Sequence, residues 1–132
     1  MKKMVYQKER KIELLYSGEY KEYKFYILNL GTHPTAYIEI PRGNNLFKKH
    51  YNGIDLNVHG GLTYSDSVLF ISENEKANGE WFIGWDYAHY DDYMPYYDEL
   101  QKALFQQLKK WTTEEIKQEC ENAIDELISN EV

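Results

Sequence analysis

The fold of this chain is decided by residues 23–30, which read Tyr-Lys-Phe-Tyr-Ile-Leu-Asn-Leu. Successive side chains of a β-strand point to opposite sides of the sheet. Tyr26, Leu28 and Leu30 would therefore share one face of the strand, and Ile27 would lie on the other. This alternation predicts a β-strand, and the same pattern identifies its neighbours.

Two shorter runs on either side of this stretch repeat the alternation. Strands are predicted over residues 12–16 and 36–40, and turn-forming residues separate them from the central run. The first turn is expected at Ser17-Gly18-Glu19 and the second at Gly31-Thr32-His33-Pro34. The three strands are expected to form an antiparallel meander.

Further strands are predicted downstream. The apolar runs at residues 67–72 and 80–86 are expected to lie centrally in the sheet, joined by a polar hairpin loop over residues 73–79. A short strand is also expected over residues 56–58. Together these runs predict a sheet of about five strands.

The end of the chain predicts two helices. An apolar repeat near helical spacing indicates one helix over residues 95–110, beginning at Pro95. Thr112 and Glu115 form the capping box of a second helix over residues 113–128. Its buried stripe is expected to consist of Ile116, Cys120, Ala123, Ile124 and Leu127. Strands followed by helices predict a single α+β domain over residues 1–132, with two helices covering one face of an antiparallel sheet.

Charge and composition argue against several classes of protein. The net charge is −7, and Lys76 is the only basic residue between Leu56 and Gln101, which argues against direct nucleic-acid binding. No window approaches the roughly 20 apolar residues of a membrane helix, and no apolar run follows Met1-Lys2-Lys3 as in a signal peptide. The single cysteine, Cys120, allows no internal disulfide, so a reducing cytoplasm is expected.

Two polar blocks, at residues 57–65 and 81–93, interrupt the predicted strands. Ionisable groups beside Trp and Tyr are costly to bury unless they are paired or bind something. Both blocks therefore predict a site, and we expect them to share one cleft. The residues expected to bind a ligand are His59, Gly60, Gly61, Thr63, Tyr64, Trp85, Asp86 and His89.

These residue types allow more than one chemistry. Asp86 and His89 at a strand end can orient a general base, hold a metal ion or bind a polar ligand. Alternatively, Asp86 caps the backbone of its own loop. Gly60 and Gly61 let a ligand approach the backbone closely, but they also suit a wide turn. The pattern of a phosphate-binding loop is missing, and no catalytic residue is assigned.

A metal site is left open but is not assigned, and no cofactor is expected. Suitable ligand types occur at His59, Asp86, His89, Asp91 and Asp92. The sequence has neither a cysteine pair nor a His-Glu-x-x-His motif, which argues against structural zinc.

The two blocks resemble a family of small uncharacterised proteins from bacteriophages and related mobile elements. The resemblance covers about residues 50–128 and depends on three motifs. These are His-Gly-Gly-Leu-Thr-Tyr at residues 59–64, Gly-Trp-Asp-Tyr-Ala-His-Tyr-Asp-Asp at residues 84–92, and Trp-Thr-Thr-Glu-Glu at residues 111–115. It carries no established activity. It implies a small accessory protein in a bacterial cytoplasm, of a type that often antagonises host defence.

Three functions follow as hypotheses. The leading one is a non-catalytic protein that binds and sequesters a small nucleotide-like ligand, since aromatic residues can stack a base. The second is an inhibitor that blocks a host defence protein through an acidic, aromatic face around Asp91 and Asp92. The third is a metal-assisted hydrolase of a nucleotide signal that uses Asp86 and His89. Phosphate contacts in the leading hypothesis would need the Gly60-Gly61 backbone or basic residues from elsewhere, which a homo-oligomer could supply.

Overall fold

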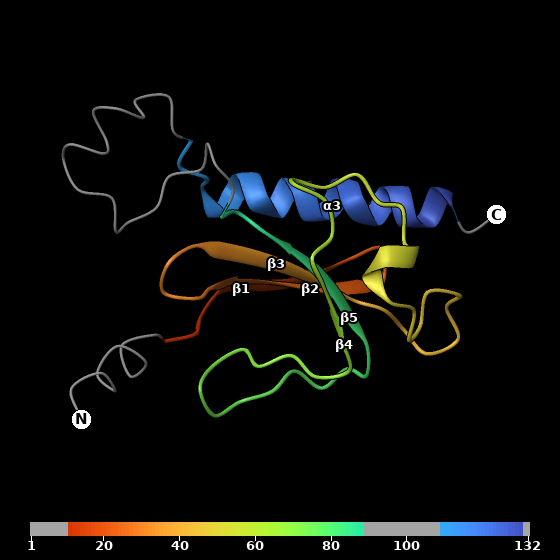
Figure 1. Ribbon diagram of the computed structural model, residues 1–132, viewed down its shortest axis with the longest axis horizontal. Helices are drawn as coiled ribbons and strands as arrows, with labels where there is room; N and C mark the ends of the chain where they lie inside the picture. Colours follow the sequence, from red (N-terminus) through yellow and green to blue (C-terminus); the bar gives the residue numbers. More distant parts are fainter. Residues whose placement is uncertain (1–10, 89–108, 131–132) are drawn as a thin grey trace.

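The computed structural model describes residues 11–88 and 109–130 of the chain. Its strands form a five-stranded antiparallel sheet in the order β1-β2-β3-β5-β4, as Figure 1 shows. The elements, in chain order, are β1 (Glu13–Tyr20), β2 (Tyr23–Asn29), β3 (Pro34–Glu39), the 3-10 helix η1 (Tyr51–Gly53), β4 (Tyr64–Asp66), β5 (Phe82–Asp86) and the helix α3 (Thr113–Ser129). The antiparallel sheet of five strands is thus as predicted.

The first hairpin differs from the prediction. The expected turn at Ser17-Gly18-Glu19 is wrong, because these residues continue β1 and pair with β2. The chain turns instead at Lys21 and Glu22, whose φ angles are 50° and 73°. A two-residue loop with positive φ at both positions matches the natural twist of the two strands, so it closes the hairpin without the glycine that usually marks such a turn.

Gly18 has a packing role inside β1. A Cβ atom at this position would lie 2.8 Å from the Tyr16 ring, so the missing side chain lets that ring lie over the strand. The Tyr16 ring reaches Phe25 of β2, with the ring centroids 5.7 Å apart. A glycine that resembles a turn signal therefore serves an aromatic contact across the hairpin.

The fourth strand is also displaced from its predicted place. The predicted strand over residues 67–72 is wrong, since β4 occupies Tyr64–Asp66 and residues 67–81 form a loop with one isolated bridge, Phe70 to Lys76. The expected short strand over residues 56–58 is likewise coil. The apolar character of the loop comes from packing on a face of the sheet, where Leu69 is buried with Leu28 and Phe82.

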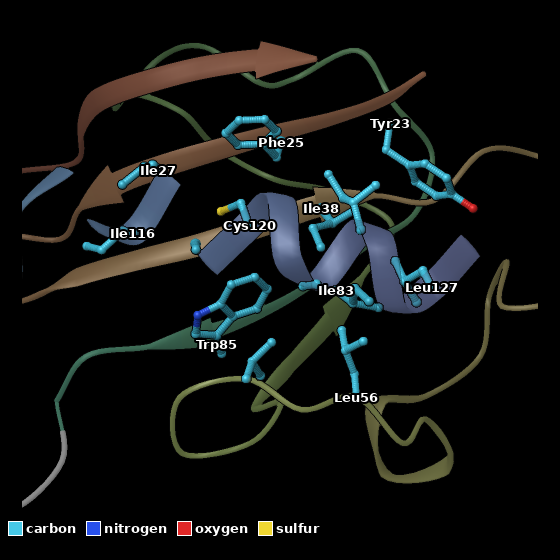
Figure 2. Packing of buried hydrophobic residues seen from close by; sticks show 14 of the residues in the cluster. Tyr23, Phe25, Ile27, Ile38, Leu56, Ile83, Trp85, Ile116, Cys120 and Leu127 are labelled. Atoms are coloured by element: carbon cyan, nitrogen blue, oxygen red, sulfur yellow. The ribbon is translucent and has the colours of Figure 1, made fainter. Parts of the chain in front are cut away.

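The opposite face of the sheet carries the main core. Thr112 caps α3 with the predicted capping box, because its side chain accepts the Glu115 N–H and the Glu115 side chain accepts the Thr112 N–H. The predicted stripe of Ile116, Cys120, Ala123, Ile124 and Leu127 is buried. Figure 2 shows Ile116, Cys120 and Leu127 of α3 lying over side chains of the sheet such as Phe25, Ile38 and Trp85.

The prediction of two helices covering the sheet is wrong. The described residues contain one α-helix, α3, and the greater part of the other predicted helix, residues 95–108, lies outside them. Residues 109–112 are not helical, and Thr112 has the extended backbone (ψ 160°) that its capping role requires. The area left beside α3 is filled by the segment of residues 44–62, which packs Leu56 and Val58 into the same core. An irregular segment thus provides part of the cover that we predicted for a helix.

No helix in residues 11–88 or 109–130 has both the length and the apolar character needed to cross a membrane.

Candidate functional site

The two polar blocks meet at the edge of the sheet. β4 pairs with β5, so Tyr64 lies opposite Gly84 and the preceding Thr63 lies beside the end of β5. The Thr63 backbone N–H donates to the Gly84 carbonyl (2.9 Å), and its hydroxyl donates to Asp86 Oδ2 (3.1 Å). Two of the residues expected at the site, Thr63 and Asp86, are therefore in contact, while the expected shared cleft of His59 with Asp86 or His89 stays a prediction.

Asp86 organises the chain around it. Its Oδ1 atom accepts the backbone N–H of Ala88 (3.1 Å), while its Oδ2 atom accepts the Thr63 hydroxyl. A carboxylate with one oxygen on its own loop and the other on a second loop fixes both. In this geometry Asp86 positions the two segments.

His59 belongs to an aromatic cluster that the sequence did not reveal. Its ring stacks on Tyr87, with centroids 4.9 Å apart and planes 7° from parallel. Trp111 completes the cluster, with its centroid 4.9 Å from His59 and 5.0 Å from Tyr87. These three residues, here called the aromatic triad, join the first block, the end of β5 and the residue before the cap of α3.

Glu119 of α3 holds two residues of the triad, Tyr87 and His59, by hydrogen bonds. It accepts a hydrogen bond from the Tyr87 hydroxyl through Oε1 and another from the His59 backbone N–H through Oε2 (2.9 Å). The Tyr87 hydroxyl also accepts the Trp85 indole N–H (2.9 Å). Burial, followed by the hydrogen bond to Glu119, raises the pKa of Tyr87, so the phenol stays protonated and donates.

The remaining predicted residues have separate places. Trp85 is 1 % exposed and belongs to the core. Gly60 and Gly61 have φ angles of 70° and 81°, in a turn closed by the Gly61 N–H and the Val58 carbonyl (2.9 Å). The ring of Tyr64 packs edge-on against Tyr37 on the other face of the sheet, away from the triad. Burial raises the pKa of Tyr64 to about 12.

Some predicted positions cannot be placed. His89, Asp91 and Asp92 lie outside the described residues. Within residues 11–88 and 109–130, no three His, Cys, Asp or Glu side chains gather in a way that could hold a metal ion.

A cavity of about 330 Å³ opens beside the triad. Tyr87 and Trp111 form its aromatic wall, with Leu15 and Pro34 as further apolar contacts. Its polar side chains come from the turn between β2 and β3 and from the segment before α3, and they are Asn29, Thr32, His33, Lys109 and Lys110. The predicted site residues thus support this cavity through His59 and Asp86, but none of them lines it.

Lys109 is held in place at the rim of this cavity. Its Nζ atom lies 2.7 Å from Glu115 Oε2 and 4.9 Å from the centroid of the Trp111 ring. The hydrogen bond from Lys109 is the main cause that lowers the pKa of Glu115. Glu115, the capping-box partner of Thr112, therefore also positions the Lys109 cation above the Trp111 ring.

Comparison of the chain with protein-family models, with curated proteins and with solved structures found no match.

Proposed function

We propose that this chain is a non-catalytic binding protein that sequesters a small nucleotide-like ligand in the cavity beside Trp111. The observation that carries the proposal is the charge of this cavity in an acidic chain. The chain has 22 acidic and 15 basic residues, yet the cavity is lined by His33, Lys109 and Lys110 and by no described acidic residue. Lys109 is paired with Glu115 at the rim and Lys110 adds a second cation, so the lining attracts an anion.

The composition of the cavity suits a ligand that has both a planar part and a charged part. Its volume of about 330 Å³ falls at the lower end of the range typical of small-molecule sites. A base that stacks on the Trp111 indole would displace Lys109 Nζ, which lies 4.9 Å from the ring centroid, toward the ligand's phosphate, and stacking of this kind is typically worth about 1–3 kcal/mol. Lys109 and Lys110 supply the phosphate contacts that the acidic middle of the chain lacks.

The turn between β2 and β3 brings two hydrogen-bonding groups to the cavity. The Thr32 hydroxyl lies 2.7 Å from His33 Nδ1, and both residues line the cavity. Within the proposal, this pair contributes hydrogen bonds to a ligand and carries out no catalytic step.

The biological context is part of the proposal. The resemblance of residues 59–64 and 84–92 to phage accessory proteins supports a protein that acts in the cytoplasm of a bacterial host. Capture of a nucleotide signal would counter a host defence that depends on that signal. Within this proposal, His59 of the first motif and Asp86 of the second hold in place the residues around the cavity without lining it.

The test is mass spectrometry of the small molecules released on denaturation of the full chain purified from bacteria. We expect the wild-type chain to release an intact nucleotide-like compound and Trp111→Leu to release much less. Trp81→Leu is the matched control, because Trp81 is also partly buried but donates its indole N–H to the Lys49 carbonyl (3.2 Å), at another place on the fold. Equal release from both variants, or turnover of nucleotides by the wild-type chain, would overturn the proposal.

A further inference from the structure

We infer that the polar residues lining the cavity beside Trp111 bind a terminal phosphate group, a phosphomonoester, and that His33 makes this binding depend on pH. This inference extends the proposed function by naming the ligand's charged group. It depends on how the turn between β2 and β3 holds its side chains.

The turn between β2 and β3 is fixed on both sides. The Leu30 N–H donates to the His33 carbonyl (3.1 Å), and the Tyr87 N–H donates to the Pro34 carbonyl (3.0 Å). The second of these bonds ties the turn directly to the aromatic wall. The contact between Thr32 Oγ1 and His33 Nδ1 then sets the orientation of the imidazole at the cavity. Polar groups that are held before a ligand arrives lose less entropy on binding.

The number of donors matches a terminal phosphate. Asn29, Lys109 and Lys110 bring N–H groups to the cavity lining, and the Thr32–His33 pair brings at least one further N–H or O–H, because the bond between these two residues uses one. The side-chain oxygen of Asn29, Oδ1, already accepts the Gly31 backbone N–H (2.8 Å). The N–H groups of the Asn29 side-chain amide are then left for a ligand. A phosphomonoester has three terminal oxygens and a charge of about −1.5 to −2 at neutral pH. A cyclic diester has two such oxygens and one charge, so it would use fewer of these donors.

The charges around His33 give the pH dependence. Lys109, which is paired with Glu115, and Lys110 line the cavity, and burial raises the pKa of Tyr87, so its phenol stays protonated. Glu13 pairs with Asn29 and Asp86 pairs with Thr35 in the sheet, but neither carboxylate lines the cavity.

Imidazoles change charge between about pH 5 and 8, and a phosphomonoester loses its second proton near about pH 6. The affinity for a phosphomonoester should therefore pass through a maximum, since the ligand gains charge as His33 loses it. The affinity for a diester, whose charge is constant, should only fall as the pH rises.

The experiment is calorimetric titration of the full chain with the 5′-monophosphates of adenosine, guanosine, cytidine and uridine between pH 5.5 and 8. The tightest of them is then compared with its nucleoside and its 3′,5′-cyclic diester. We expect the monophosphate to bind at least about tenfold more tightly than both, because a charge-assisted hydrogen bond is worth about that factor.

His33→Gln separates the pH dependence from simple loss of the fold. We expect this variant to bind the monophosphate about tenfold more weakly at pH 6.5, to lose the fall in affinity above that pH, and to bind the nucleoside unchanged. His50→Gln is the control, since His50 caps η1 and stacks on Tyr51 away from the cavity.

Two results would overturn the inference and leave the proposed function standing. They are equal affinity for monophosphate and nucleoside, and an unchanged pH profile in His33→Gln. Failure of every nucleotide and nucleoside to bind would overturn the proposed function as well.

Discussion

Replacing Glu119 by alanine should be among the most damaging single changes on the surface of α3. Glu119 accepts the Tyr87 hydroxyl and the His59 N–H (2.9 Å for the latter). A hydrogen bond to a charged group contributes about 1.5–3 kcal/mol, and the more exposed bond to His59 about 0.5–1.5 kcal/mol. We expect the free energy of unfolding to fall by about 2–4 kcal/mol, measured by urea denaturation.

A matched control comes from the same helix. Glu126 accepts the Asn57 N–H, an exposed contact at 3.1 and 3.3 Å, so Glu126→Ala should cost only about 0.5–1 kcal/mol. The coupling can be measured directly with Tyr87→Phe. The double variant Glu119→Ala/Tyr87→Phe should lose about 1.5–3 kcal/mol less than the sum of the single losses, since the shared bond is removed only once. Additivity within about 0.5 kcal/mol would refute the anchoring role of Glu119.

Two other variants and one labelling experiment test separate parts of the fold. Glu22→Gly should stabilise the protein by about 0.5–1 kcal/mol in thermal or urea unfolding, because Glu22 has a φ of 73° that glycine adopts without strain; a loss of stability would contradict the turn. Gly84→Ala should destabilise it by about 2–3 kcal/mol, since its Cβ would lie 2.4 Å from the Tyr37 ring and 2.7 Å from the Ala36 carbonyl; a neutral result would show that β5 is not packed against β3 in this way. Burial raises the pKa of Cys120, so a thiol reagent at pH 8 should label it no faster than the protein unfolds, and rapid labelling of the folded chain would contradict its place in the core.

The sequence predicted most reliably those elements whose signals are local. The capping box at Thr112 and Glu115 and the buried stripe of α3 appear as expected, because helix caps and helical periodicity depend only on neighbouring residues. The central strands β2 and β3 appear for the same reason. Their alternating side chains separate two cores on the two faces of the sheet.

The errors arose where tertiary packing used a local signal for another purpose. Gly18 looked like a turn residue, but it makes room for the Tyr16 ring. Residues 67–72 looked like a strand, because Leu69 packs on the sheet without joining it. The helix over residues 95–110 was predicted from an apolar repeat that lies largely outside the described residues.

The candidate site shows the same division. The polar groups that interrupt the strands indicated that the two blocks are near each other, and Thr63 does contact Asp86, but the particular pair of side chains was not predicted. The cavity was not, because His33 comes from a turn and Lys109 from a segment far along the chain. The one signal that could have indicated it is the pair of lysines directly before Trp111, a cationic and aromatic cluster in an otherwise acidic chain.

The most direct measurement of the central claim is a titration followed by NMR, using the three indole N–H signals of Trp81, Trp85 and Trp111. Each reports on a different place, namely the Lys49 carbonyl, the buried Tyr87 hydroxyl and the cavity wall. On addition of the tightest nucleoside monophosphate, we predict a saturable shift of the Trp111 signal with the Trp81 signal unchanged. A shift of Trp81 alone, or no shift of any indole at millimolar nucleotide, would contradict the claim that this cavity binds a nucleotide-like ligand.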